Sequence, residues 1–176
     1  MTEHGEIRTL LPHRHPVLLV DRVLEIEPGE RIVTVKAVTG SEPCFAGIPD
    51  GAPAQAYDFP AALLVESFGQ SGALLWLHTM RGSGGVPPGV LIFAQARDCV
   101  ITGAARPGDV LRHEVRISSL KQTNVFLTGE TWVGDRRIAS MGSAMAVIRE
   151  SDSLVPAPAS DDTAAPAAAI PMGERA

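Results

Sequence analysis

The sequence contains little cysteine, the residue that builds disulfides and thiolate metal or redox sites. Cys44 and Cys99 are the only cysteines among 176 residues, and their spacing is not that of metal ligands. A single pair also provides no disulfide framework. We therefore expect both thiols to be reduced and buried as packing residues, the usual state of free cysteine.

Segments for membranes or nucleic acid are also missing. No uncharged apolar run approaches the roughly 18 residues that a spanning helix needs, and charged and histidine residues precede the first apolar stretch, unlike a secretory leader. The formal net charge is −5, and no basic run with interleaved aromatic residues is present. These absences exclude membrane-spanning and nucleic-acid-binding proteins and predict a cytoplasmic protein.

The apolar pattern predicts one domain over residues 1–150. A long apolar stretch at 59–80 is typical of a helix, and a loop rich in glycine and proline precedes it at 41–59. The segments with strand patterns are 16–29, 30–40, 90–101, 109–122, 124–134 and 136–150. Two strands, a helix and a run of strands indicate the α+β class, with one helix against an antiparallel sheet.

Residues 151–176 differ from the rest of the chain. They are rich in alanine and proline and have no apolar periodicity. Such a segment buries too little apolar surface to offset the entropy lost on ordering. We predict that 151–176 is a disordered tail.

The predicted helix is apolar on almost every side and yet contains Glu66. A helix of that kind is normally buried, and the small residues Gly69 and Gly72 would let a sheet approach closely. A carboxylate held in a low-dielectric pocket is suited to proton transfer, and Gln70, one turn later on the same face, would orient it or a bound water. The alternative is a solvated Glu66 near an edge of the helix. Spacing alone leaves both open.

Four motifs carry a resemblance to a known family. They are "LLPHRHPVLLVDRVLEIEPGERI", "SEPCFAG", "PAALLVESFGQ" and "ARPGDVLRHEV". In this order, over about residues 10–148, the chain resembles the (3R)-hydroxyacyl-acyl-carrier-protein dehydratases of bacterial fatty-acid synthesis. The resemblance implies a single hot-dog domain, in which a curved antiparallel sheet wraps one long helix, and a dimer whose two sheets join.

The resemblance also implies a lyase site at the dimer interface. In that family each site combines a histidine from the loop before one subunit's helix with a glutamate from the other subunit's helix. Glu66 and Gln70 match the helix glutamate and glutamine. Ala61 stands at the family's glycine, where a peptide N–H at the helix N-terminus can polarise a thioester carbonyl. We expect Phe59 to contact the substrate with Ala61 and Gln70.

No metal or nucleotide cofactor is implied by the resemblance. The acyl substrate would arrive on the phosphopantetheine arm of an acyl carrier protein, which is the expected partner besides a second hot-dog subunit. The reaction would belong to fatty-acid or polyketide biosynthesis.

The loop before the helix departs from the family pattern. The family reads G-H-F-P-G, whereas this chain reads "AGIPDGAPAQAYDFP", a longer loop with Ile48 directly after Gly47. None of the five histidines lies in it. His13 belongs to "LPHR", which the family shares, and a packing or hydrogen-bonding role is expected for it. His78 lies roughly 18 Å along the helix from Glu66, too far to be its partner within one chain.

Asp58 is the best local replacement for the missing histidine. In "YDFP" it stands where "GHFP" has histidine, and with Glu66 it would form a pair of carboxylates for acid–base work. Alternatively, Asp58 caps the helix. A homodimer would use Asp58, whereas a heterodimer would take a histidine from a second hot-dog subunit, which accounts for both the kept glutamate and the lost histidine. A thioesterase of the same fold and a non-catalytic acyl-binding subunit are alternative functions.

Overall fold

The computed structural model describes residues 2–82, 84–85, 88–121 and 123–149. Its helices are α1 (His4–Leu10) and α2 (Ala61–Arg81), with short 3₁₀ turns at Pro43–Phe45 and Ala54–Tyr57. The strands are β1 (Arg22–Glu27), β2 (Arg31–Ala37), β3 (Val90–Ile101), β4 (Val110–Leu120), β5 (Asn124–Val133) and β6 (Arg136–Arg149). The predicted tail at 151–176 lies outside the described residues, so the domain limit at 150 and the disorder beyond it stay predictions.

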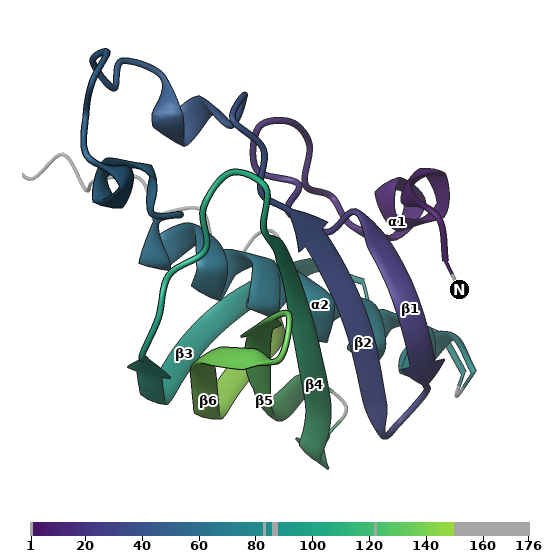
Figure 1. The fold of residues 1–176 in the computed structure, drawn as a ribbon. Coiled ribbons are helices and arrows are strands. Elements are labelled where there is room, and N and C mark those ends of the chain that lie inside the picture. The colour runs from purple at the N-terminus through teal and green to yellow at the C-terminus, as the bar shows by residue number, and fades with distance from the viewer. Residues whose placement is uncertain (1, 83, 86–87, 122, 150–176) are drawn as a thin grey trace, which may run out of the picture.

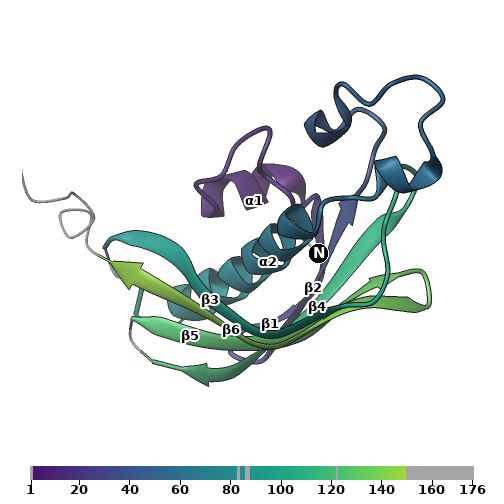
Figure 2. The same cartoon turned by 90° about the vertical axis from the view of Figure 1, so that its left-hand side faces the viewer.

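The six strands form one antiparallel sheet in the order β1-β2-β4-β5-β6-β3. The sheet curves around α2, which lies in its concave face, and α1 lies on the side of α2 away from the sheet (Figures 1 and 2). This arrangement confirms the α+β class and the hot-dog architecture expected from the sequence.

Helix α2 sits deep in the sheet because its sequence combines large apolar and very small residues. Leu74, Leu75 and Trp76 are fully buried. A Cβ atom added at Gly72 would collide with Cδ1 of Leu127 on β5, so the leucine would have to shift for any larger residue, whereas glycine lets helix and strand approach closely. Although α2 is apolar on most sides, no helix within the described parts of the chain is long and apolar enough to cross a membrane.

The region before β1 differs from its prediction. Helix α1 was not anticipated, because it has seven residues and buries only Ile7, too little for a helical period to be visible. The strand predicted over 16–29 begins at Arg22. Ahead of it, the backbone of Val17 and Leu19 is hydrogen-bonded to the side chain of Gln70 on α2. The segment therefore crosses α2 instead of extending the sheet.

Strand β3 forms one edge of the sheet and is largely exposed in the single chain. Residues 94–101 are all exposed, and Val100 retains 52% of its accessible surface. Cys99 lies in this stretch and is exposed, while Cys44 is half-buried; both are free thiols. The expectation that both cysteines are buried is wrong, because β3 has a neighbouring strand on one side only.

Candidate active site

Glu66 lies on α2 and is held by Gln70. The Gln70 Nε2 donates to Glu66 Oε1 at 2.8 Å, and the same nitrogen donates to the Val17 carbonyl at 2.6 Å. The Gln70 Oε1 accepts from the Leu19 N–H at 2.7 Å. Gln70 is buried and fixed by backbone groups on two sides, so it orients the carboxylate. The Glu66 side chain is 36% exposed, a position between the buried and the solvated alternatives.

A histidine lies next to this carboxylate. The His13 Nε2 is 3.3 Å from Glu66 Oε1, and the His13 side chain is 28% exposed. Its Nδ1 is buried and has no hydrogen-bond partner among the described residues. The neighbouring Arg14 donates to the carbonyls of Leu11 and His13 at 2.8 and 2.6 Å, which fixes the backbone at this point.

Sequence reasoning did not bring His13 and Glu66 together. A partner for Glu66 was expected in the loop before α2 or on the helix itself, whereas His13 lies in the segment that crosses α2 ahead of β1. The packing or hydrogen-bonding role expected for His13 stays a prediction, and its proximity to Glu66 was not anticipated. The "LPHR" motif was the available signal, and no local periodicity shows where that motif folds.

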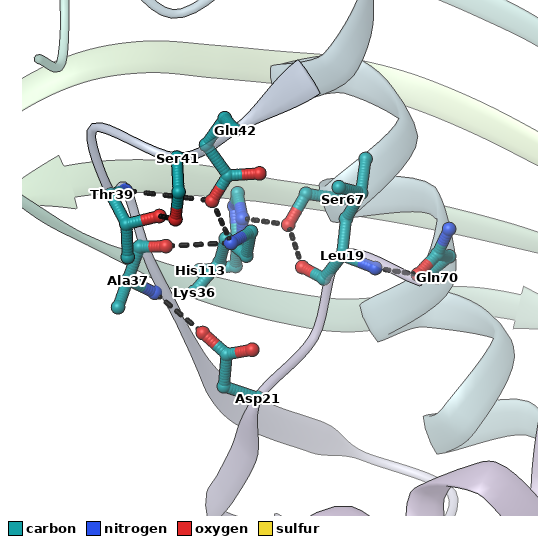
Figure 3. Close-up of polar contacts among 10 residues, drawn as sticks. All are labelled: Leu19, Asp21, Lys36, Ala37, Thr39, Ser41, Glu42, Ser67, Gln70 and His113. Atoms are coloured by element: carbon teal, nitrogen blue, oxygen red, sulfur yellow. Dashed lines mark hydrogen bonds and ion pairs between the residues drawn. The ribbon is translucent and has the colours of Figure 1, made fainter. Parts of the chain in front are cut away.

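A second histidine meets the residue that follows Glu66 on the helix. Ser67 lies between Leu19 and His113 in Figure 3. The Ser67 hydroxyl donates to the Leu19 carbonyl at 2.6 Å, so it accepts from His113 Nε2 at 2.8 Å. The His113 Nδ1 then accepts from the Thr131 hydroxyl at 2.8 Å. Complete burial lowers the pKa of His113 to about 3, which keeps the ring neutral.

The loop between β2 and α2 is anchored at both ends. At its start, Lys36 Nζ donates to Glu42 Oε1 and to the Ala37 carbonyl, each at 2.6 Å (Figure 3). The Lys36 side chain is buried, and the Glu42 side chain retains only 11% exposure. At its end, the Phe59 N–H donates to the Ala105 carbonyl at 2.7 Å. The loop therefore leaves and re-enters the fold at fixed points.

Asp58 does not cap α2. The N-cap of α2 is Pro60, and no side chain caps this helix end. The carboxylate of Asp58 instead accepts from Arg106 Nε at 2.6 Å in an ion pair. The capping alternative is therefore wrong, because Pro60 takes the capping position and Arg106 takes the carboxylate. Within the described residues no hydrogen bond or ion pair joins Asp58 to Glu66, and a catalytic role for Asp58 stays a prediction.

The other two predicted residues flank the helix start. Ala61 is the first residue of α2 and is exposed. The first-turn N–H groups of a helix have no intrahelical acceptor, and within the described residues Pro60 at the N-cap makes no side-chain capping hydrogen bond to them. Phe59 is only 5% exposed and packs in an apolar cluster with Phe45 and Leu64. Substrate contacts of Ala61 and Phe59 stay predictions.

A cavity of about 450 Å³ lies beside His13. Its walls come from α1 and the residues after it, from α2, and from the paired ends of β3 and β6. The apolar lining residues are Leu10, Leu11, Leu77, Val90, Leu91 and Ile148, and Arg8 and Arg14 also border the cavity. Within the described ranges, no group of three or more His, Cys, Asp or Glu side chains is placed to hold a metal ion.

Solved structures share this fold at low sequence identity. The dehydratase heterocomplex ApeI:P from Xenorhabdus doucetiae aligns with a TM-score of 0.67 at 13% identity, covering 84% of this chain and 93% of that chain. A hypothetical thioesterase protein with coenzyme A, from Streptococcus pneumoniae, aligns with a TM-score of 0.54 at 10% identity, covering 73% of this chain and 85% of that one. These likenesses establish the fold.

Curated relatives are much closer in sequence, although no family model matches the chain. The 3-hydroxyacyl-[acyl-carrier-protein] dehydratase FabZ of Symbiobacterium thermophilum is 38% identical over 85% of this chain and 98% of its own length. The protein of the same name from Caldanaerobacter subterraneus is 36% identical over 84% of this chain and 99% of its own. The chain therefore belongs to the 3-hydroxyacyl-[acyl-carrier-protein] dehydratase family.

Proposed function

We propose that this chain removes water from 3-hydroxyacyl thioesters carried on an acyl carrier protein. The observation that carries the proposal is Glu66, a half-buried carboxylate oriented by Gln70 at the position of the family's helix glutamate. Dehydration needs a base for the proton on C2 and an acid for the hydroxyl that leaves C3. One oxygen of Glu66, Oε1, meets Gln70 and His13. Among the described residues no hydrogen bond reaches Oε2, which leaves it for the substrate.

The surroundings of Glu66 suit the rest of such a substrate. The apolar cavity beside His13 would take the acyl chain. The N–H groups in the first turn of α2, at Ala61, would donate hydrogen bonds to the thioester carbonyl oxygen. This oxygen gains negative charge when the C2 proton leaves. The chain's own residues would thus orient the substrate on both sides of C2 and C3: the acyl chain in the cavity and the thioester carbonyl at the helix N-terminus. The only prosthetic group in this proposal is the carrier protein's phosphopantetheine arm, and we assign the protein to the cytoplasm.

We further propose that β3 pairs with a second hot-dog subunit. A long edge strand with exposed Val100 and Ile101 presents unpaired backbone groups and apolar surface, which a soluble protein normally covers. The subunit is either a copy of this chain or a relative that bears the loop histidine.

The reactivity of Cys99, an exposed thiol on β3, tests whether this strand is paired. Its thiol should react slowly in the assembled protein and quickly after dilution below the dissociation constant. Equal rates, or a monomer by light scattering, would contradict this contact.

Product analysis tests the proposed reaction. The purified chain, alone and mixed with a histidine-bearing hot-dog subunit, is incubated with a 3-hydroxyacyl carrier protein, and the carrier is analysed by mass spectrometry. Loss of 18 Da from the carrier-bound chain identifies the enoyl product. Release of a free 3-hydroxy acid would show a thioesterase. Binding without any change of mass in either setting would identify a non-catalytic acyl-binding subunit.

A further inference from the structure

The proposed reaction needs a second proton-transferring group, and the loop before α2 does not provide the family's histidine. The sequence has Ile48 directly after Gly47, and Asp58 is paired with Arg106. We propose that His13 is the base of the elimination and that it works with Glu66 of the same chain as the acid. This inference rests on the proposed function and adds a residue that the loop pattern does not point to.

The backbone around His13 is fixed well enough for such a role. On one side, Arg14 binds the carbonyls of Leu11 and His13. On the other side, Gln70 binds the backbone of Val17 and Leu19. The Arg14 bonds are local to this segment, whereas the Gln70 bonds attach it to α2 through the same side chain that orients Glu66. Gln70 thus binds Glu66 directly and also binds the segment that carries His13.

The ring nitrogens of His13 are not both held by hydrogen bonds among the described residues, unlike those of a structural histidine. A histidine with a purely structural role uses both ring nitrogens, as His113 does with Ser67 and Thr131. His13 directs Nε2 toward Glu66, and its Nδ1 has no partner among the described residues. Its ring is partly exposed and borders the apolar cavity. A substrate in that cavity therefore reaches the imidazole.

The pair needs one proton and no further reactant. The reaction starts from the form of the pair in which the one proton is on Glu66 and His13 Nε2 carries none. Nε2 takes the proton from C2, and the electrons of that C–H bond form the C2=C3 double bond. The C3–O bond breaks, and the hydroxyl takes the proton of Glu66 and leaves as water. The imidazolium then returns its proton to the carboxylate across the 3.3 Å contact. The products are the enoyl thioester and water.

Substitution of His13 tests the inference in the full chain purified alone. The substrate is a 3-hydroxyacyl carrier protein, and kcat and KM are measured for the wild type, for His13→Gln and for His13→Gly, with His4→Gln as the matched exposed control. We expect His13→Gln to lower kcat by about 100-fold or more, the usual contribution of a general base. KM should change less than about 3-fold. Added imidazole should restore part of the activity of His13→Gly, which a lost packing contact would not allow, and His4→Gln should match the wild type.

Three outcomes overturn the inference. Full activity of His13→Gln excludes His13 as the base. A loss that imidazole does not restore, together with a lowered melting temperature, assigns His13 to structure. The third outcome is a chain inactive alone that eliminates water once a histidine-bearing hot-dog subunit is added, with the same rate for His13→Gln. That result places the base in the partner and leaves the proposed function intact, whereas no elimination in any mixture refutes both proposals.

Discussion

Glu66 and Ser67 are neighbours on α2, and each meets a histidine from another part of the chain. Ser67 meets His113, whose two nitrogens are both hydrogen-bonded and whose ring is completely buried. Glu66 meets His13, which is partly exposed and has one nitrogen without a partner in the described parts of the chain. Two histidines that contact neighbouring residues of α2 thus have different roles in our proposal: His113 is structural and His13 transfers protons. Burial and saturation of the ring's hydrogen bonds, not the presence of an imidazole, decide whether a histidine is able to carry protons.

The largest effect is expected from Glu66→Gln. The amide keeps the shape of the side chain but neither carries nor accepts the proton, so kcat should fall by about 1,000-fold. The melting temperature should hold or rise slightly, because a half-buried charge is costly. The rate of product formation measures kcat, and thermal unfolding measures the melting temperature. Activity that survives Glu66→Gln, with or without a partner subunit, would end the acid–base assignment of this helix.

His113→Ala is expected to affect stability instead of chemistry. It leaves Ser67 and Thr131 short of a partner and opens a cavity, which together should lower the free energy of unfolding by about 3 kcal/mol. His13→Ala should lower it by less than about 1 kcal/mol, since the ring is partly exposed. Urea unfolding gives both values. If His13→Ala and His113→Ala lower the free energy of unfolding equally, then His13 is as structural as His113, and the distinction between the two histidines fails.

The buried histidine should also make stability depend on pH. Its pKa is about 3 in the folded chain and near 6.5 when unfolded. The unfolded state therefore binds more protons between these values, so the contribution is complete above pH 6.5 and is lost progressively as pH falls toward 3. Lowering pH from 6.5 to 4.5 should cost about 2.5 kcal/mol from this residue alone. His113→Gln should flatten the urea-unfolding profile over that range, and an unchanged slope would contradict the assignment.

A smaller loss of stability than that of His113→Ala is expected from Thr131→Val. It removes the hydroxyl that donates to His113 Nδ1 and preserves the side-chain shape, so it should lower the free energy of unfolding by about 1 kcal/mol. The kcat of the folded protein should not change. A drop in kcat would mean that the His113 network reaches the chemistry, and the two histidines would then form one system.

The sequence predicted the fold well because long periodic segments determine it. The limits of β3 were predicted without error, and the apolar pattern with its small residues placed α2 against the sheet. Helix α1 was missed because it has one buried side chain.

The site was predicted less completely. Glu66 and Gln70 share one helix face, so their contact follows from spacing. The contact of Glu66 with His13 depends on how a non-helical, non-strand segment crosses α2, and that path has no sequence period. The ion pair of Asp58 with Arg106 joins two loops and was equally invisible.

The anchors at Lys36–Glu42 and Phe59–Ala105 have a consequence for how this protein diversifies. They fix both ends of the loop, and between them Phe45 is buried in the apolar cluster with Leu64 of α2 and Phe59. A loop from a relative, exchanged between Glu42 and Phe59, is therefore expected to leave the helix in place if it supplies an apolar side chain where Phe45 packs.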